Sequence, residues 1–254
     1  MLILLSPAKT LNEDPSPNSR FSICDFLSET AKLLPYLKKL SRKKIMALMD
    51  ISEKLAELNF SRYQNFVLPD QDGLGKQAIY SFEGDVYQNM DVKIWNSSQE
   101  TYAQNNLRIL SGLYGLLRPF DLMSPYRLEM GTALKTGRGK NLYQFWGERI
   151  TKKLNQEIEE SSHDCVVNLA SIEYASVVQP EKLKAPFIQV DFKEIRDGQL
   201  KTIALNSKRA RGKMAQYLIM NQAKTLQEIQ SFCEGGYLYD SSASKPDHLL
   251  FVKA

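Results

Sequence analysis

Hydrophobic residues occur along the chain in short continuous runs, at helical spacing and in strict alternation, and each pattern predicts a different element. The continuous runs are typical of buried strands. One covers residues 1–5 and ends at Ser6-Pro7, after which a polar loop extends to Arg20. Another covers residues 165–170 and is followed by Ser171, which can cap a helix. We therefore expect two buried strands that each end at a polar corner.

The other two patterns predict the helices and the hairpins. The predicted helices are residues 23–40 with an interruption at Pro35, a helix capped by Ser41, a helix capped by Ser52, residues 97–106 with Ser97 and Glu100 at capping-box spacing, residues 141–158 and residues 208–221. The segments that alternate with period two predict two β-hairpins, one formed by residues 187–195 and 200–205 around Asp197-Gly198 and one by residues 237–240 and 248–252.

Residues 107–110 fit either a strand or the entry to a tight turn. The chain has no internal repeat and no linker. We therefore predict a single mixed α/β domain over residues 1–254, with a mixed central sheet and surrounding helices.

Composition places the chain among ordinary soluble globular proteins, because 43% of its 254 residues are hydrophobic and 24% are charged. The 33 basic and 29 acidic residues give a net charge of +4, which permits an anionic partner without requiring one. The basic residues are clustered. Six lie in residues 29–44 against Glu29 alone, and five lie in residues 118–140 against two acidic residues.

The cysteines Cys24, Cys165 and Cys233 are odd in number and far apart, so they predict neither a disulfide framework nor a metal knuckle. A cytoplasmic location is expected. Cys165 lies in an apolar run and the other two lack a cationic neighbour, which argues against redox sensing. The apolar start of the chain is too short for a signal peptide or a membrane span, so no membrane partner is expected.

Several common site chemistries lack support in the sequence. The two histidines, His163 and His248, have no companion at metal-ligand spacing, so no metal site is predicted. The run Gly73-Leu74-Gly75-Lys76 lacks the earlier glycine and the Ser or Thr of a phosphate loop. The run Gly137-Arg138-Gly139-Lys140 lacks the strand and the third glycine of a dinucleotide site. No cofactor is predicted.

Lys9 directly follows the first predicted strand, in the run Ser6-Pro7-Ala8-Lys9-Thr10. Ligands of α/β sheets tend to bind at strand ends, where a lysine can contact a phosphate. A solvated loop lysine explains the same residues equally well.

The segment from Leu110 to Pro119 contains Ser111, Gly112, Tyr114, Gly115 and Arg118. It is similar to the turn of a helix-hairpin-helix element, in which glycines expose backbone N–H groups to a phosphate. The two glycines are three residues apart, whereas the usual hairpin has them two apart. A buried turn with glycines chosen for positive φ is the alternative.

The irregular segment 121–131 contains Tyr126, Arg127 and Glu129 among apolar residues, as the wall of a pocket does. Arginine can bind an anion with two hydrogen bonds, tyrosine can stack, and glutamate can act as a base. An Arg–Glu pair that pins a long loop is the alternative.

Residues 207–213 contain Lys208, Arg209, Arg211 and Lys213 at the predicted start of a helix. Mutual repulsion and the positive helix terminus disfavour this arrangement unless an anion lies nearby, so the segment predicts anion binding. A solvated basic helix face is the alternative.

Taken together, these motifs resemble the YaaA family of bacterial proteins, which is associated with resistance to peroxide stress. The strings that carry the resemblance are residues 1–10, 111–115, 125–131, 142–147, 168–171 and 208–212. The resemblance implies a compact mixed α/β fold, a positively charged cleft beside a helix-hairpin-helix-like element, DNA binding through both, and cytoplasmic protection from hydrogen peroxide. By position, it marks as site residues Lys9, Ser111, Gly112, Arg127, Glu129, Asn168, Ser171, Lys208, Arg209 and Arg211.

The leading hypothesis is a monomeric stress protein that binds DNA with little sequence specificity. The DNA is expected to be single-stranded, a bubble or a distorted duplex, with Tyr114, Tyr126 or Trp146 stacked on unpaired bases. The expected contacts are Lys9, Ser111, Gly112, Tyr114, Gly115, Arg118, Tyr126, Arg127, Asn168, Ser171, Lys208, Arg209, Arg211 and Lys213.

The alternative hypothesis is an enzyme that acts on a nucleobase, a nucleoside or another small anionic substrate. Glu129 would be its acid or base, and Lys9 and Arg127 would anchor the anion. Both hypotheses predict that Lys9 lies within reach of Arg127 and Glu129, about 120 residues away in the sequence.

Overall fold

The computed structural model describes residues 1–17, 19–70 and 72–254. The apolar run at the start of the chain forms strand β1 (Leu2–Leu5), and all four of its residues are buried. β1 pairs in parallel with β5 (Leu107–Ser111) on one side and with β8 (Val166–Asn168) on the other. These strands are mostly apolar along their whole length because helices cover both of their faces.

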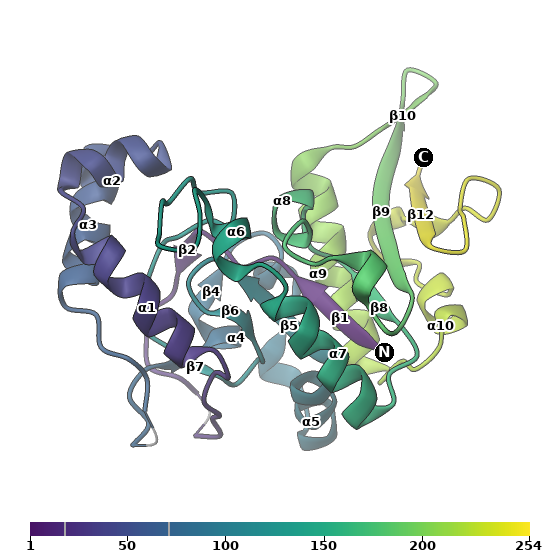
Figure 1. Cartoon of the computed structure of the whole chain (residues 1–254). Helices are drawn as coiled ribbons and strands as arrows, with labels where there is room; N and C mark the ends of the chain where they lie inside the picture. Colours follow the sequence, from purple (N-terminus) through teal and green to yellow (C-terminus); the bar gives the residue numbers. More distant parts are fainter. Residues whose placement is uncertain (18, 71) are drawn as a thin grey trace.

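Eight strands form one sheet in the order β11-β12-β9-β8-β1-β5-β6, with β10 paired to β9 (Figure 1). The remaining strands of this sheet are β6 (Gly115–Leu117), β9 (Phe187–Arg196), β10 (Gln199–Lys201), β11 (Leu238–Tyr239) and β12 (His248–Lys253). Two small pairs lie outside it, β2 (Thr10–Leu11) with β4 (Phe82–Glu83) and β3 (Lys76–Gln77) with β7 (Leu122–Met123).

The order of the parallel strands determines where a ligand can bind. β5, β1, β8, β9 and β12 are parallel to one another. The chain therefore adds its second parallel strand on one side of β1 and the three later ones on the other side. In doubly wound sheets, ligands bind at the carboxyl ends of the strands where this order reverses. Here the reversal point, which we call the switch point, lies between β1 and β8.

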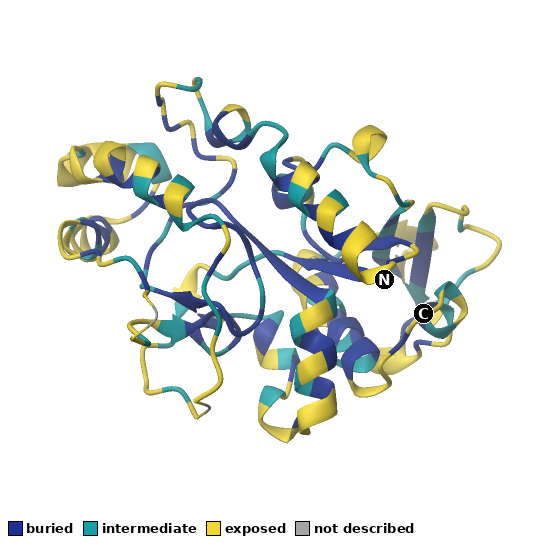
Figure 2. Ribbon diagram, turned by 60° about the horizontal axis from the view of Figure 1, so that its bottom comes forward, coloured by how far each residue is buried: buried dark blue, intermediate teal, exposed yellow. Residues whose placement is uncertain are grey.

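Helices surround the sheet, and their exposed residues face away from the buried strands (Figure 2). The α-helices are α1 (Leu27–Lys38), α2 (Arg42–Met49), α3 (Glu53–Gln64), α4 (Ala78–Ser81), α5 (Ser97–Asn106), α6 (Leu142–Trp146), α7 (Arg149–Ser161), α8 (Ile172–Ala175), α9 (Ala204–Met220) and α10 (Leu226–Gln230). The 3-10 helices are η1 (Tyr87–Asn89), η2 (Val92–Ile94), η3 (Pro180–Lys182) and η4 (Glu234–Gly236). None of the described helices is long and apolar enough to cross a membrane.

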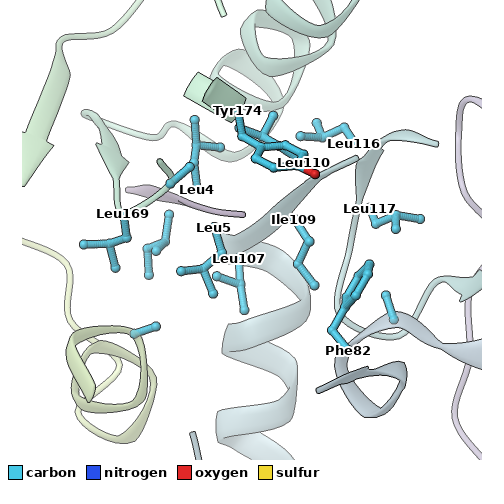
Figure 3. Close-up of a cluster of buried hydrophobic side chains, with 14 of the residues drawn as sticks. Leu4, Leu5, Phe82, Leu107, Ile109, Leu110, Leu116, Leu117, Leu169 and Tyr174 are labelled. Atoms are coloured by element: carbon cyan, nitrogen blue, oxygen red, sulfur yellow. The ribbon is translucent and has the colours of Figure 1, made fainter. Parts of the chain in front are cut away.

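The core has two layers, one on each side of the central strands. Leu107 and Ile109 of β5 point to one side, whereas Leu110 points to the other side with Tyr174 of α8 (Figure 3). All four side chains are buried. This alternation follows from the period of two in a strand, and it anchors helices on both faces.

The structure confirms the mixed α/β fold with its central mixed sheet, both predicted strands and both hairpins. It also confirms the helices capped by Ser41 and Ser52, whose side chains accept hydrogen bonds from the backbone N–H groups of Lys44 and Leu55. The loop predicted from Ser6 to Arg20 contains the short strand β2, and its residue Asn18 lies outside the described residues.

Several predicted helix limits are wrong. Helix α1 continues through Pro35, because burial of Leu33, Leu34 and Leu37 offsets the one backbone hydrogen bond that proline cannot make. Residues 141–158 form two helices, α6 and α7, separated at Gly147 with φ of +52°.

The starts of α5 and α9 also differ from the prediction. The capping box of α5 uses Asn96 and Gln99, one residue before the predicted pair. Helix α9 begins at Ala204 and not at Lys208, since the buried face of Met214 continues back through Ala210 and Ser207. Leu205 therefore belongs to this helix and not to the preceding hairpin.

Residues 107–117 form a β-hairpin, not the predicted helix-hairpin-helix-like element. β5 and β6 pair antiparallel, with Ser111 opposite Gly115, whose φ is +71°. Both strands are buried, and their apolar residues pack into the core. The glycines therefore serve a tight buried turn, which was the alternative interpretation of this segment.

Candidate functional site

A cleft of about 270 Å³ lies at the switch point, at the carboxyl ends of β1 and β8. Its walls come from four parts of the chain that are distant in sequence: the segment after β1, residues 83–87, the end of β8 with α8, and helix α9. Hydrogen bonds join the two strand ends. The backbone N–H of Ser171 donates to Ser6 Oγ at 2.8 Å, and the Tyr87 hydroxyl donates to the carbonyl of Ser6 at 2.9 Å. The cleft therefore has a rigid floor.

Lys9, Arg127 and Glu129 lie together in one wall of this region, which confirms the prediction of their proximity. Glu129 is bound between the two cations: its Oε2 is 3.0 Å from Lys9 Nζ and its Oε1 is 2.9 Å from Arg127 Nη2. The backbone of Arg127 is fixed by a hydrogen bond, which its carbonyl oxygen accepts from the Tyr63 hydroxyl. The side chain of Lys9 is 62% exposed, so it is the member of this group that a ligand can reach first.

Helix α9 contributes two cations to the cleft, Lys208 and Arg211. Arg209 points to Asp85, 3.5 Å away, and Lys213 is not among the described residues that line the cleft. Because α9 begins at Ala204, Lys208 and Arg211 are the fifth and eighth residues of the helix. The prediction that these cations stand at the start of a helix is therefore wrong, but two of the four, Lys208 and Arg211, face the cleft.

Arg211 has an unusual environment among the described residues. Its side chain makes no hydrogen bond or ion pair with any of them, and its Nε is shielded from solvent. Burial lowers the pKa of the Arg211 guanidinium, and the nearby charge of Asp191 opposes this change. A shielded guanidinium without a partner is costly for a folded protein. This cost is typical of a residue that meets its partner only when a ligand binds.

The same cleft also contains acidic residues, which no sequence pattern indicated. Glu83, Asp85 and Glu173 line it, so three carboxylates stand beside the three cations Lys9, Lys208 and Arg211. Two of these carboxylates already have partners: Asp85 faces Arg209, and Glu173 accepts a hydrogen bond from the N–H of Gly131 at 2.9 Å. The three acids resemble ordinary surface residues in the sequence because they come from separate segments.

The aromatic residues predicted to stack on bases are buried. Tyr114 and Trp146 have no exposed surface, and Tyr126 is 4% exposed. Their polar atoms bond inside the protein: the Tyr126 hydroxyl is 2.6 Å from Ser111 Oγ, and the Trp146 indole N–H donates to the carbonyl of Gly112. Burial raises the pKa of the Tyr126 hydroxyl. These aromatic side chains belong to the core beneath the site and cannot contact DNA.

Other predicted site residues are also part of the scaffold. A Cβ atom at Gly112 would lie 2.3 Å from the carbonyl oxygen of Leu128, so this glycine permits close approach of the segment that carries Glu129. Arg118 pairs with Asp121 at 3.0 Å, away from the cleft. Asn168 is buried and donates to Gln189. Sequence position alone could not separate these supporting residues from the ones that reach the surface.

The cysteines are free, and they are not gathered at the cleft. Cys24 and Cys165 are buried, whereas Cys233 is exposed. Burial raises the pKa of both buried thiols, which disfavours the reactive thiolate.

Comparison with known proteins gives a consistent result over the whole chain. Residues 1–243 match the family described as peroxide stress protein YaaA. A UPF0246 protein of Aliivibrio fischeri strain MJ11 is 46% identical over 254 residues, which cover all of this chain and 98% of that protein. UPF0246 proteins of Shewanella baltica strain OS195 and of a Marinomonas species are 45% and 46% identical, with coverage of all of this chain and 99% and 97% of those proteins.

Proposed function

Because the chain belongs to the peroxide stress protein YaaA family, we propose that it acts in the peroxide response by binding DNA at the switch-point cleft. The phosphate backbone is the ligand, and binding has little sequence specificity. Lys208 and Arg211 supply the main contacts, and Lys9 adds a third cation at the entrance.

The observation that carries this proposal is the unpaired Arg211. A phosphate can accept two parallel hydrogen bonds from a guanidinium and would remove the cost of shielding its charge. Lys208, one turn earlier on α9, also makes no ion pair with a described residue and faces the same cleft. The two unpaired cations are therefore placed to bind one phosphate group together.

The geometry favours backbone recognition over base recognition. The cations approach the cleft from a helix and a loop, and the predicted base-stacking aromatics are buried. Contacts from lysine and arginine to phosphate fix the position of a nucleic acid but carry no sequence information. A volume of about 270 Å³ suits one phosphate and its sugar, so the cleft holds a single unit of a strand.

A salt titration tests the proposal. Replacement of Lys208, Arg209 and Arg211 together by Ala should reduce the slope of log affinity against log salt by roughly 0.7–0.9, because Lys208 and Arg211 neutralise one phosphate together. Arg209 should add little because it faces Asp85. A matched control is Lys43→Ala with Lys44→Ala, two exposed lysines on α2. An unchanged slope in the triple variant would reject the cleft as the binding surface.

One observation favours a second candidate, an enzyme that acts on a small anionic substrate. Glu129 is held between Lys9 and Arg127, and carboxylates equal cations in number along the cleft. This balance suits a compact polar substrate better than a long polyanion. Glu129→Gln distinguishes the two functions, since it keeps the shape of the side chain and removes its charge. Loss of peroxide protection with unchanged DNA affinity and thermal stability would support the enzyme; unchanged protection would reject it.

A further inference from the structure

A second pocket lies between helix α1 and residues 136–138. Its volume is about 410 Å³. Lys32 of α1, Lys39 directly after α1 and Arg138 of the loop contribute its charged side chains, and Tyr36 of α1 contributes an aromatic ring. We call it the α1–loop pocket. It combines parts of the two basic clusters of the sequence, which are about 100 residues apart along the chain.

The α1–loop pocket is more strongly basic than the switch-point cleft. The described residues that line it include three cations and no carboxylate. The nearest acidic partner is Glu29, which pairs with Arg138 and lies 2.7 Å from Lys32 Nζ, and whose side chain is 12% exposed. Lys39 is exposed and makes no ion pair with a described residue. The three cations that line the pocket are therefore only partly neutralised by Glu29, and the remaining positive charge can attract an anion.

The pocket is also rigid enough to hold a ligand. The N–H of Gly137 donates to the Tyr36 hydroxyl at 2.9 Å, which fixes the loop on α1 and sets the orientation of the ring. The loop is closed by a hydrogen bond from the N–H of Thr136 to the carbonyl of Gly139. The Arg138 guanidinium lies over the ring of Phe145 at 4.8 Å. Tyr36 nevertheless stays 37% exposed, so part of its surface is free to contact a ligand.

We propose that the α1–loop pocket binds a nucleotide unit, with its phosphate among Lys32, Lys39 and Arg138 and its base stacked on Tyr36. Clustered cations beside an exposed aromatic ring are the features by which proteins bind single-stranded nucleic acids without reading their sequence. The nucleotide is either free or part of a strand. This inference goes beyond the proposed function, since it concerns a separate pocket and different residues.

The structure gives a length scale for the case of a strand. Glu129 and Thr136 are seven residues apart, so roughly 25 Å at most separates their Cα atoms. A single strand of about eight nucleotides is long enough to reach from Glu129, beside Lys9, to the α1–loop pocket at ~3.4 Å per nucleotide. Occupation of both pockets by one strand would raise its affinity above that of a mononucleotide.

Calorimetric titration of the full chain tests the inference with four probes: inorganic phosphate, deoxyadenosine monophosphate, a ten-residue oligodeoxyadenylate and polyglutamate. Lys39→Ala and Tyr36→Leu should each weaken nucleotide binding about five-fold or more. Tyr36→Phe keeps the ring but loses the hydrogen bond from the Gly137 N–H, so it should bind more weakly than the wild type and more tightly than Tyr36→Leu. Lys43→Ala is the matched control, because Lys43 is exposed on α2 and does not line the pocket. All of these positions are on the surface, and thermal unfolding of each variant checks that it is folded.

The outcomes separate this inference from the proposed function. If the pocket variants weaken the mononucleotide, the source is a free nucleotide; if they weaken only the oligonucleotide, the source is a strand. If only Lys208→Ala and Arg211→Met weaken the oligonucleotide, the inference is overturned and the cleft stands. If only the pocket variants weaken binding of the oligonucleotide, the inference stands and the cleft is rejected as the binding surface. Equal binding by Tyr36→Leu and the wild type, or tighter binding of polyglutamate than of the oligonucleotide, would also overturn the inference.

Discussion

Arg108 and Arg211 differ in whether their guanidinium groups have partners among the described residues. Arg108, near the amino end of β5, is 5% exposed and donates to Glu157 at 2.8 Å and to the carbonyls of Gln104 and Leu107. Arg211, at the switch-point cleft, makes no such bond with any described residue. Arg108 therefore completes a closed ion pair, whereas Arg211 is left with bonding capacity for a ligand.

The difference shows that burial alone does not identify a functional charge. Both guanidinium groups are removed from water to some degree, but only Arg211 lacks the partner that would offset the loss of hydration. The useful criterion is a shielded charge that has no partner and lines a cleft. Arg127 illustrates the intermediate case, because it lines the site wall and already pairs with Glu129.

The largest expected effect on stability comes from breaking the ion pair between Arg108 and Glu157. Arg108→Met should leave the Glu157 carboxylate buried without its main partner, and should lower the free energy of unfolding by about 3–5 kcal/mol. Urea unfolding measures this loss, and DNA affinity of the folded fraction should be unchanged. A loss below about 1 kcal/mol would show that Lys153, 3.6 Å from Glu157, can replace Arg108.

A second prediction tests whether Ser111 belongs to the scaffold. Its hydroxyl contacts the Tyr126 hydroxyl at 2.6 Å and accepts a hydrogen bond from the N–H of Tyr114 at 2.9 Å. Ser111→Ala leaves both buried groups without a partner and should cost about 1–3 kcal/mol of stability. The salt dependence of DNA binding should stay as in the wild type. A change in the salt slope without a loss of stability would restore Ser111 as a DNA contact.

The smallest expected effect on stability concerns Glu29, whose negative charge is paired with Lys32 and Arg138 beside the α1–loop pocket. A hydrogen bond from Arg138, helped by Lys32, lowers the pKa of Glu29 from 4.5 to about 2. A carboxyl group with a lowered pKa stabilises the fold fully above the pKa of the unfolded chain, and this contribution disappears as the pH falls from about 4.5 to 2. Relative to the wild type, Glu29→Gln should be less stable by about 1 kcal/mol at pH 7.

Urea unfolding of the wild type and Glu29→Gln between pH 7 and pH 2.5 measures this difference. It should be constant above pH 5 and shrink steadily below pH 4.5. A difference that does not change with pH would mean that the Arg138 pair contributes nothing to stability through the charge of Glu29.

The sequence predicted the elements of the sheet well because each buried strand has a local signature. The runs at residues 1–5 and 165–170 are apolar, short and bounded by polar corners, and the hairpin at Asp197-Gly198 has a characteristic turn. Helix limits were less accurate. Tertiary packing allows α1 to continue through Pro35, and it separates two helices at Gly147 within residues 141–158. The local sequence pattern predicts neither outcome.

The candidate site was predictable in part. Lys9, Arg127 and Glu129 meet as expected, because irregular segments beside apolar strands tend to gather at sheet ends. The hairpin at Gly112 and Gly115 resembled a DNA-binding turn, yet its residues are buried. The acids of the cleft and the unpaired state of Arg211 depend on contacts between distant segments, so no sequence pattern could reveal them.

The most direct test of the account compares Arg211→Met with the wild type, in stability and in binding. Without DNA, the variant should be at least as stable as the wild type, since Met fills a similar volume and Arg211 is shielded without a protein partner among the described residues. Its affinity for a single-stranded oligonucleotide should fall about ten-fold or more, as expected when a guanidinium–phosphate pair is removed. A loss of several kcal/mol in stability with unchanged affinity would contradict the account and make Arg211 a structural residue like Arg108.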